Sequence, residues 1–77
     1  MIELDSGDIV YYSPNLALGL LLDNFINKDG QVVWNYLLRS PTRADLSFHL
    51  VSRQQVQESK LVDAISNGRF LHYKMKG

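Results

Sequence analysis

The alternation of apolar and polar residues predicts two strands at the start of the chain. Residues 8–12 are rich in β-branched and aromatic side chains and lie between two turn segments, residues 6–7 and 13–15. Residues 16–25 contain enough leucine for a helix. Gly19 in the middle of that segment, and the absence of a helix cap before it, favour a strand instead.

The segment 28–30 predicts a tight hairpin, because Lys-Asp-Gly is turn chemistry and Val, Val, Trp and Tyr follow it. With Gly30 in the left-handed conformation, opposite residues carry numbers that sum to 58, and Leu22 faces Tyr36. This register places even-numbered, largely apolar residues of both strands on one face and predicts that Trp34 and Tyr36 lie in the core. A loop one residue longer would pair a leucine with an asparagine, because a slip of one residue turns every side chain over.

A helix is predicted in the second half of the chain. Residues 52–55 read Ser-Arg-Gln-Gln, which has the form of a helix capping box. Leu61, Val62 and Ile65 then form a narrow apolar stripe at helical spacing. Because that stripe begins late, a helix that starts nearer Ser59 is the alternative.

Two further strands flank this helix in the prediction. Residues 40–42 end the hairpin strand, and residues 47–51 are a short strand candidate. The Asn-Gly pair at 67–68 is a helix stop signal. Residues 69–75 alternate in the manner of a closing strand.

Length and composition predict one domain without covalent reinforcement. The chain has 77 residues, 45% of them hydrophobic, and no cysteine, so neither a disulfide nor a thiolate metal site can supplement the core. A domain of this size is marginally stable, so its core or an oligomer interface must supply the stability. The absence of cysteine favours a cytoplasmic protein. The acidic start and the short apolar run 16–22 predict neither an export signal nor a membrane span.

The net charge of the chain is zero, which argues against strong nucleic-acid binding, because such binding neutralises several phosphates at once. The charges are unevenly spread: residues 1–38 carry a net charge of −4 and residues 39–77 a net charge of +4. A surface of mixed, solvated charges is the simple interpretation. A head-to-tail or self-complementary contact between copies of the chain is the alternative.

Three segments resemble the pattern of small SH3-like and KOW-like barrels: GDIV at 7–10, GLLL at 19–22 and DGQVVW at 29–34. In such domains Gly-Asp opens the first strand, a second glycine lets the next strand bend, and Val-x-Trp closes the hairpin. Many short uncharacterised proteins of tailed phages and bacteria are similar too. The resemblance covers residues 7–38, about half of the chain.

The predicted helix departs from that family, since a minimal barrel has only a short turn before its last strand. The fold class that we predict is therefore mainly β (α+β). It is a single SH3-like domain over residues 1–77, an antiparallel barrel with one helix before the last strand. The apolar stripe of the helix would cap one open end of the barrel.

No arrangement typical of catalysis or metal binding is found in the sequence. His49 and His72 are 23 residues apart, and no His-x-x-x-His or Cys spacing supports a metal site. The glycines form no phosphate-binding loop, and the serines lack a nucleophile elbow. Asp5 and Asp8 are interpreted as part of a solvated turn. We therefore expect neither an enzyme nor a cofactor.

The aromatic residues are the best functional candidates. Tyr11 and Tyr12 are neighbours in a predicted strand, so only one of them can point inside. The other is a candidate partner contact, since SH3 folds bind proline-rich segments through aromatic side chains. The sequence thus predicts a non-catalytic protein-interaction or structural module, an accessory protein of a phage or bacterium, with a protein partner or a second copy of the chain.

The alternative function is a nucleic-acid-binding module of KOW type. It would use basic and histidine side chains of the closing strand, together with arginines from other parts of the chain. These candidate residues are Arg39, Arg43, Arg69, His72, Lys74 and Lys76.

Overall fold

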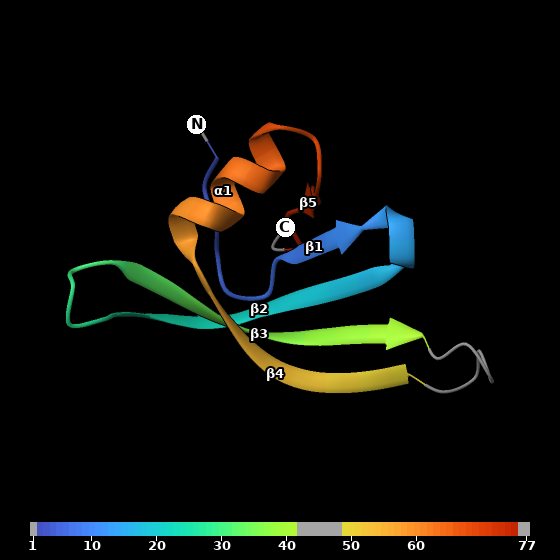
Figure 1. The fold of residues 1–77 in the computed structure, drawn as a ribbon, viewed down its shortest axis with the longest axis horizontal. Helices are drawn as coiled ribbons and strands as arrows, with labels where there is room; N and C mark the ends of the chain where they lie inside the picture. The colour runs from blue at the N-terminus through green and yellow to red at the C-terminus, as the bar shows by residue number, and fades with distance from the viewer. Residues whose placement is uncertain (1, 42–48, 76–77) are drawn as a thin grey trace.

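The computed structural model describes residues 2–41 and 49–75, and these form one antiparallel sheet with one α-helix (Figure 1). The order of the strands across the sheet is β4-β3-β2-β1-β5. The elements in chain order are β1 (Ile9–Tyr12), the 3-10 turn η1 (Ser13–Asn15), β2 (Ala17–Ile26), β3 (Val32–Pro41), β4 (His49–Gln57), α1 (Glu58–Ser66) and β5 (Leu71–Tyr73). The fold is thus mainly β, with the helix before the last strand.

The sheet is open, whereas a closed barrel was expected. Strands β4 and β5 are its two edges, and in the described part of the chain they do not pair with each other. Helix α1 follows β4 without a break and packs over one face of the sheet, against β3 and β4 (Figure 1). The helix thus lies in the connection between β4 and β5, where a minimal barrel has only a short turn.

The predicted hairpin register is correct near the turn and wrong beyond a β-bulge. Asn24 pairs with Trp34 as expected, and Gly30 has a positive φ of 78°. The register then shifts between Leu21 and Asp23, so that Leu21 rather than Leu22 faces Tyr36. Because one extra residue turns the strand over, the even-numbered leucines of the first half of β2 leave the core face.

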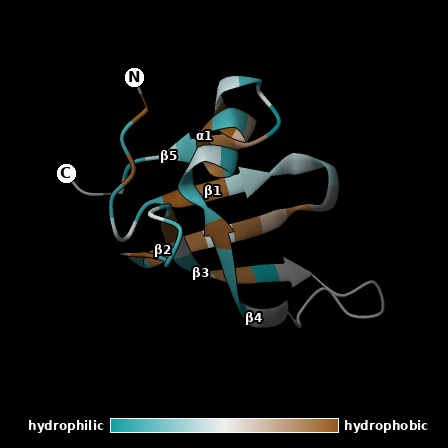
Figure 2. Ribbon diagram, turned by 60° about the vertical axis from the view of Figure 1, so that its left-hand side comes forward, coloured by the Kyte–Doolittle hydropathy of each residue, from teal (hydrophilic) through white to brown (hydrophobic). Residues whose placement is uncertain are grey.

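The core lies between the sheet and α1. Val10, Leu21, Trp34 and Leu61 form its buried cluster, and Trp34 is only 1% exposed, as the sequence predicted. The indole Nε1–H of Trp34 donates a hydrogen bond of 3.0 Å to Glu58 Oε1 at the start of the helix. Figure 2 shows how hydropathy is distributed over the fold: apolar residues are concentrated in the three central strands, and α1 carries both apolar and polar residues.

Strand β4 continues to Gln57, so the capping box predicted at 52–55 is wrong and the later helix start is correct. Residues 52–57 pair with β3, and Val56 points inward opposite Trp34. Pairing along β3 therefore overrides the local helix signal. The predicted end is confirmed, since Asn67 is the C-cap and Gly68 has a φ of 82°.

Replacing Gly30 with alanine is expected to destabilise the protein by about 1 kcal/mol, the cost of a left-handed conformation for a side chain. A Cβ at this position would meet no atom within 4 Å, so conformational strain is the whole effect. Gly30→Asn should lose less, because asparagine adopts this conformation more readily. Urea unfolding measures both variants, and equal stability of Gly30→Ala and wild type would contradict the prediction.

Candidate functional site

The face of the sheet that points away from α1 is apolar across four strands. Val10 and Leu21 pack with the helix, so the residues beside them, Ile9 and Leu20, point to the opposite face. Cross-strand partners lie on the same face of a sheet. The partners that continue these rows over β5, β1, β2 and β3 therefore also point away from α1. We call this set the outer patch: Ile9, Tyr11, Leu18, Leu20, Leu37, Leu71 and Tyr73.

The exposure of the outer patch is high for such large side chains. Leu20 is 37% exposed, Leu71 47% and Tyr73 49%, and the other members are half-buried. Scattered apolar residues are normal on a protein surface, but a contiguous apolar area marks a contact site. The outer patch is contiguous because each member is the direct cross-strand neighbour of another.

Two arginines border the outer patch on the β3–β4 side. Arg53 is the partner of Leu37, and Arg39 is the partner of Leu18. Both arginines are exposed, and neither forms a salt bridge with any carboxylate in residues 2–41 or 49–75. Two guanidinium groups without an ion pair among the described residues therefore lie beside an apolar surface.

A ladder of polar side chains borders the outer patch along the strands, just past the β-bulge. Asn35 Nδ2 donates to Asp23 Oδ1 at 2.7 Å, and Gln55 Nε2 donates to Asn35 Oδ1 at 3.0 Å. The three residues are cross-strand neighbours on β2, β3 and β4. An apolar centre with a polar margin is the anatomy of a protein–protein interface.

The sequence interpretation missed most of this surface because it placed Leu20 on the core face. The β-bulge exchanges the two faces of β2, so Gly19 and Leu21 point inward while Leu18 and Leu20 point outward. One signal could have revealed the outer patch. The run 16–22 is apolar at nearly every position, which is typical of a strand whose two faces are both apolar.

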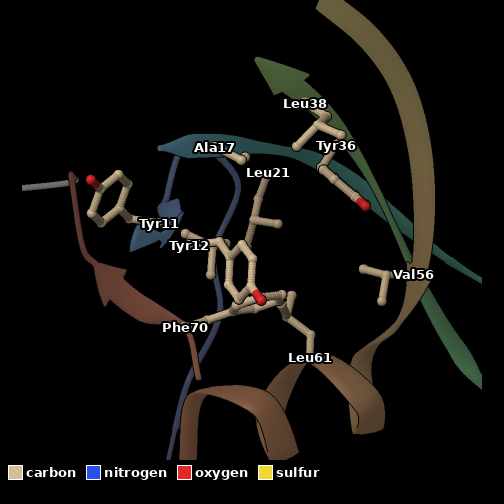
Figure 3. Close-up of a pocket in the computed structure, with 11 residues that line it drawn as sticks. Tyr11, Tyr12, Ala17, Leu21, Tyr36, Leu38, Val56, Leu61 and Phe70 are labelled. Carbon is tan, nitrogen blue, oxygen red and sulfur yellow. The ribbon is translucent and has the colours of Figure 1, made fainter. Parts of the chain in front are cut away.

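Tyr11 and Tyr12 point to different sides, and Tyr11 is the one that belongs to the outer patch. The ring of Tyr12 packs edge-to-face on Phe70, with ring centroids 5.4 Å apart. Figure 3 shows Tyr12 pointing into an apolar pocket between the sheet and α1, while the ring of Tyr11 points away from it. The pocket has a volume of about 80 Å³ and lies beside Gly19, whose missing side chain leaves room near Tyr36.

Asp8 is completely buried, which corrects the expectation of a solvated turn. Its Oδ2 accepts hydrogen bonds from His72 Nε2 at 2.8 Å and from the backbone N–H of Asp5 at 3.0 Å. Lys74 Nζ lies 3.5 Å from the same oxygen. Burial by itself would raise the pKa of Asp8, but these hydrogen bonds and the positive charge of Lys74 hold the pKa below its ordinary value. The pair of Asp8 and His72 thus fastens β5 to the start of β1.

The described residues of the nucleic-acid alternative are not gathered on one surface. His72 points inward and bonds Asp8, and Lys74 forms an ion pair of 2.6 Å with Asp5. Arg39 is on β3, which two other strands separate from β5 in the sheet, and Arg69 is exposed between α1 and β5. The other two candidates, Arg43 and Lys76, lie outside the described residues.

No protein-family model, curated protein or solved structure matches this chain. In the part of the chain that the structure describes, no group of three or more His, Asp or Glu side chains is placed to hold a metal ion. None of the helical residues described forms a segment long and apolar enough to cross a membrane. The outer patch is therefore the candidate site, and its own geometry carries the functional conclusion.

Proposed function

We propose that this chain is a non-catalytic protein-interaction module that binds a protein partner through the outer patch. The observation that carries the proposal is the contiguous apolar surface over β5, β1, β2 and β3. Its composition supports the proposal further, because Tyr11 and Tyr73 within the patch and Arg39 and Arg53 beside it are residue types enriched at binding hot spots.

The proposal includes an SH3-like relationship. Four consecutive antiparallel strands, a β-bulge in β2 and a fifth strand that lies beside the first support it. Helix α1 and the open sheet are the departures from a minimal barrel. Within this proposal Tyr11 is the tyrosine that contacts the partner, since Tyr12 packs on Phe70 in the interior. An accessory role in a phage or bacterium fits a small module of this kind.

A photo-reactive amino acid tests the proposal. Placed at position 20 in the centre of the outer patch, a benzophenone side chain should cross-link to a polypeptide when native cells are irradiated. The matched control is position 60, an exposed lysine on α1, from which no such product is expected. Absence of a product from position 20, or equal products from both positions, would overturn the proposal.

The alternative of a KOW-like nucleic-acid-binding module has weaker support. Two of its residues, His72 and Lys74, are engaged with Asp8 and Asp5, which lowers the positive charge they can offer to phosphates. The same photo-reactive experiment separates the two functions. Cross-linked nucleic acid in place of a polypeptide would favour the alternative, and its binding would weaken steeply with salt.

A further inference from the structure

We infer that the outer patch binds a second copy of this chain in a two-fold symmetric dimer. In this dimer the outer faces of the two sheets stack on each other, and the two-fold axis runs parallel to β2, between the two β2 strands. The inference rests on the proposed function and names its partner.

One row of side chains on the outer face is complementary to the same row read in reverse. An isologous interface requires this property, because each copy presents the same surface to the other. A two-fold axis parallel to β2 leaves the position of each residue along the strand direction unchanged. It reverses the order of the strands, so that β5 of one copy lies over β4 of the other. It places Tyr73 over the second copy's Arg53, Ile9 over its Leu37, and Leu20 over its Leu20. Across the sheet, the row reads Tyr73, Ile9, Leu20, Leu37, Arg53.

The neighbouring row obeys the same axis. It runs from Leu71 through Tyr11 and Leu18 to Arg39. The axis places Tyr11 over the second copy's Arg39 and Leu18 over its Leu18. Each copy therefore offers two tyrosine rings to two guanidinium groups, an arrangement that favours cation–π stacking, with aliphatic contacts between them.

The charges of the chain favour the same arrangement. The chain has no net charge, so two copies approach without long-range repulsion. With strands about 4.8 Å apart, each Arg39 lies about 10 Å sideways from its symmetry mate and each Arg53 about 19 Å. An axis perpendicular to the strands would instead stack β3 and β4 on their own mates and gather all four arginines on one side. The axis along β2 is thus favoured over that arrangement.

The outer face is large enough for a dimer interface. A standard protein–protein interface buries about 800 Å² on each partner, which is about one seventh of the 5602 Å² surface of this chain. The outer patch and its polar margin extend over all five strands, so stacking them can bury an area of this order. Two twisted sheets pack at about 30° with aligned strands, and a two-fold axis that bisects this angle lies nearly parallel to β2.

Sedimentation over a concentration series from about 1 to about 500 micromolar tests the dimer. We expect the wild type to dimerise reversibly in this range. Leu20→Asp should weaken the dimer tenfold or more, because the two-fold axis brings the two carboxylates together. Ile26→Asp is the control, since Ile26 is 70% exposed on the hairpin outside the patch and should leave the equilibrium unchanged. A wild type that stays monomeric throughout would overturn the inference.

Single cysteines test the axis without disturbing the fold, because the chain has none of its own. A short bismaleimide should join two copies of Leu20→Cys efficiently and two copies of Arg53→Cys poorly. Equal products from both variants would overturn the proposed axis. The dimer and the proposed function can fail separately. If the photo-reactive group at position 20 captures a different polypeptide and the chain is monomeric, only the dimer is wrong. If it captures nothing and the chain is monomeric, both are wrong.

Discussion

Replacing Trp34 with alanine is expected to remove a large share of the free energy of unfolding of the protein. The side chain is 1% exposed and packs with Val10, Leu21 and Leu61, and its indole N–H bonds Glu58. Truncating a buried aromatic side chain costs about 3–5 kcal/mol. A domain of this length has a free energy of unfolding of roughly 4–12 kcal/mol, so the substitution removes a large share or all of it.

Thermal and urea unfolding measure this loss, and two variants make it specific. Ile26→Ala, on the same hairpin but 70% exposed, should change the free energy of unfolding by less than about 0.5 kcal/mol. Trp34→Phe keeps most of the buried ring and loses the bond to Glu58, so its stability should lie between the other two. A Trp34→Ala variant that melts within a few degrees of wild type would place Trp34 at the surface instead.

Replacing Asp8 with asparagine is expected to destabilise the protein by about 1.5–3 kcal/mol at neutral pH, the usual contribution of hydrogen bonds to a charged group. The carboxylate is completely buried, and Oδ2 accepts hydrogen bonds from His72 and from the backbone of Asp5. Asparagine has a similar size, so the variant removes the charge without opening a cavity. The loss should weaken the attachment of β5 to β1.

The effect of Asp8 should depend on pH, with a defined sign. Folding lowers the pKa of Asp8 from its ordinary value of 3.8, so the ionised carboxylate stabilises the fold fully above that value. The contribution is lost as the pH falls through the lower, folded pKa. The stability gap between wild type and Asp8→Asn should therefore narrow in acid below about pH 4.

Urea unfolding at neutral pH and at about pH 2.5 tests this dependence. The matched control is Asp5→Asn, because Asp5 is half-exposed and its ion pair with Lys74 is screened by water. This control should change stability little at either pH. A gap for Asp8→Asn that is as wide in acid as at neutral pH would show that the charge of Asp8 contributes nothing.

Several parts of the fold could be predicted because short-range chemistry decides them. The turn at Gly30 follows from Lys-Asp-Gly, the end of the helix from Asn-Gly, and the burial of Trp34 from its place in an apolar strand. A helix before the last strand was also predictable from the spacing of its apolar residues. In each case the residues that decide the outcome lie within a few positions of one another.

The interior position of Asp8 could not be predicted in this way. Its partner His72 is 64 residues further along the chain, and only the pairing of β1 with β5 brings the two together. From local sequence alone, an aspartate beside a glycine is typical of a solvated turn. Likewise, β4 replaced the predicted capping box because β3, a distant segment in sequence, paired with it.

Local propensity and turn chemistry are properties of short segments, so they suffice to predict the order of the strands and the helix, the tight turn and the end of the helix. The tertiary structure alone decided which side of β2 faces the core. Side chains alternate along a strand with a period of two, so the single bulge between Leu21 and Asp23 exchanges the faces. That exchange turns Leu18 and Leu20 outward, where they and their neighbours on β1 and β3 form the outer patch.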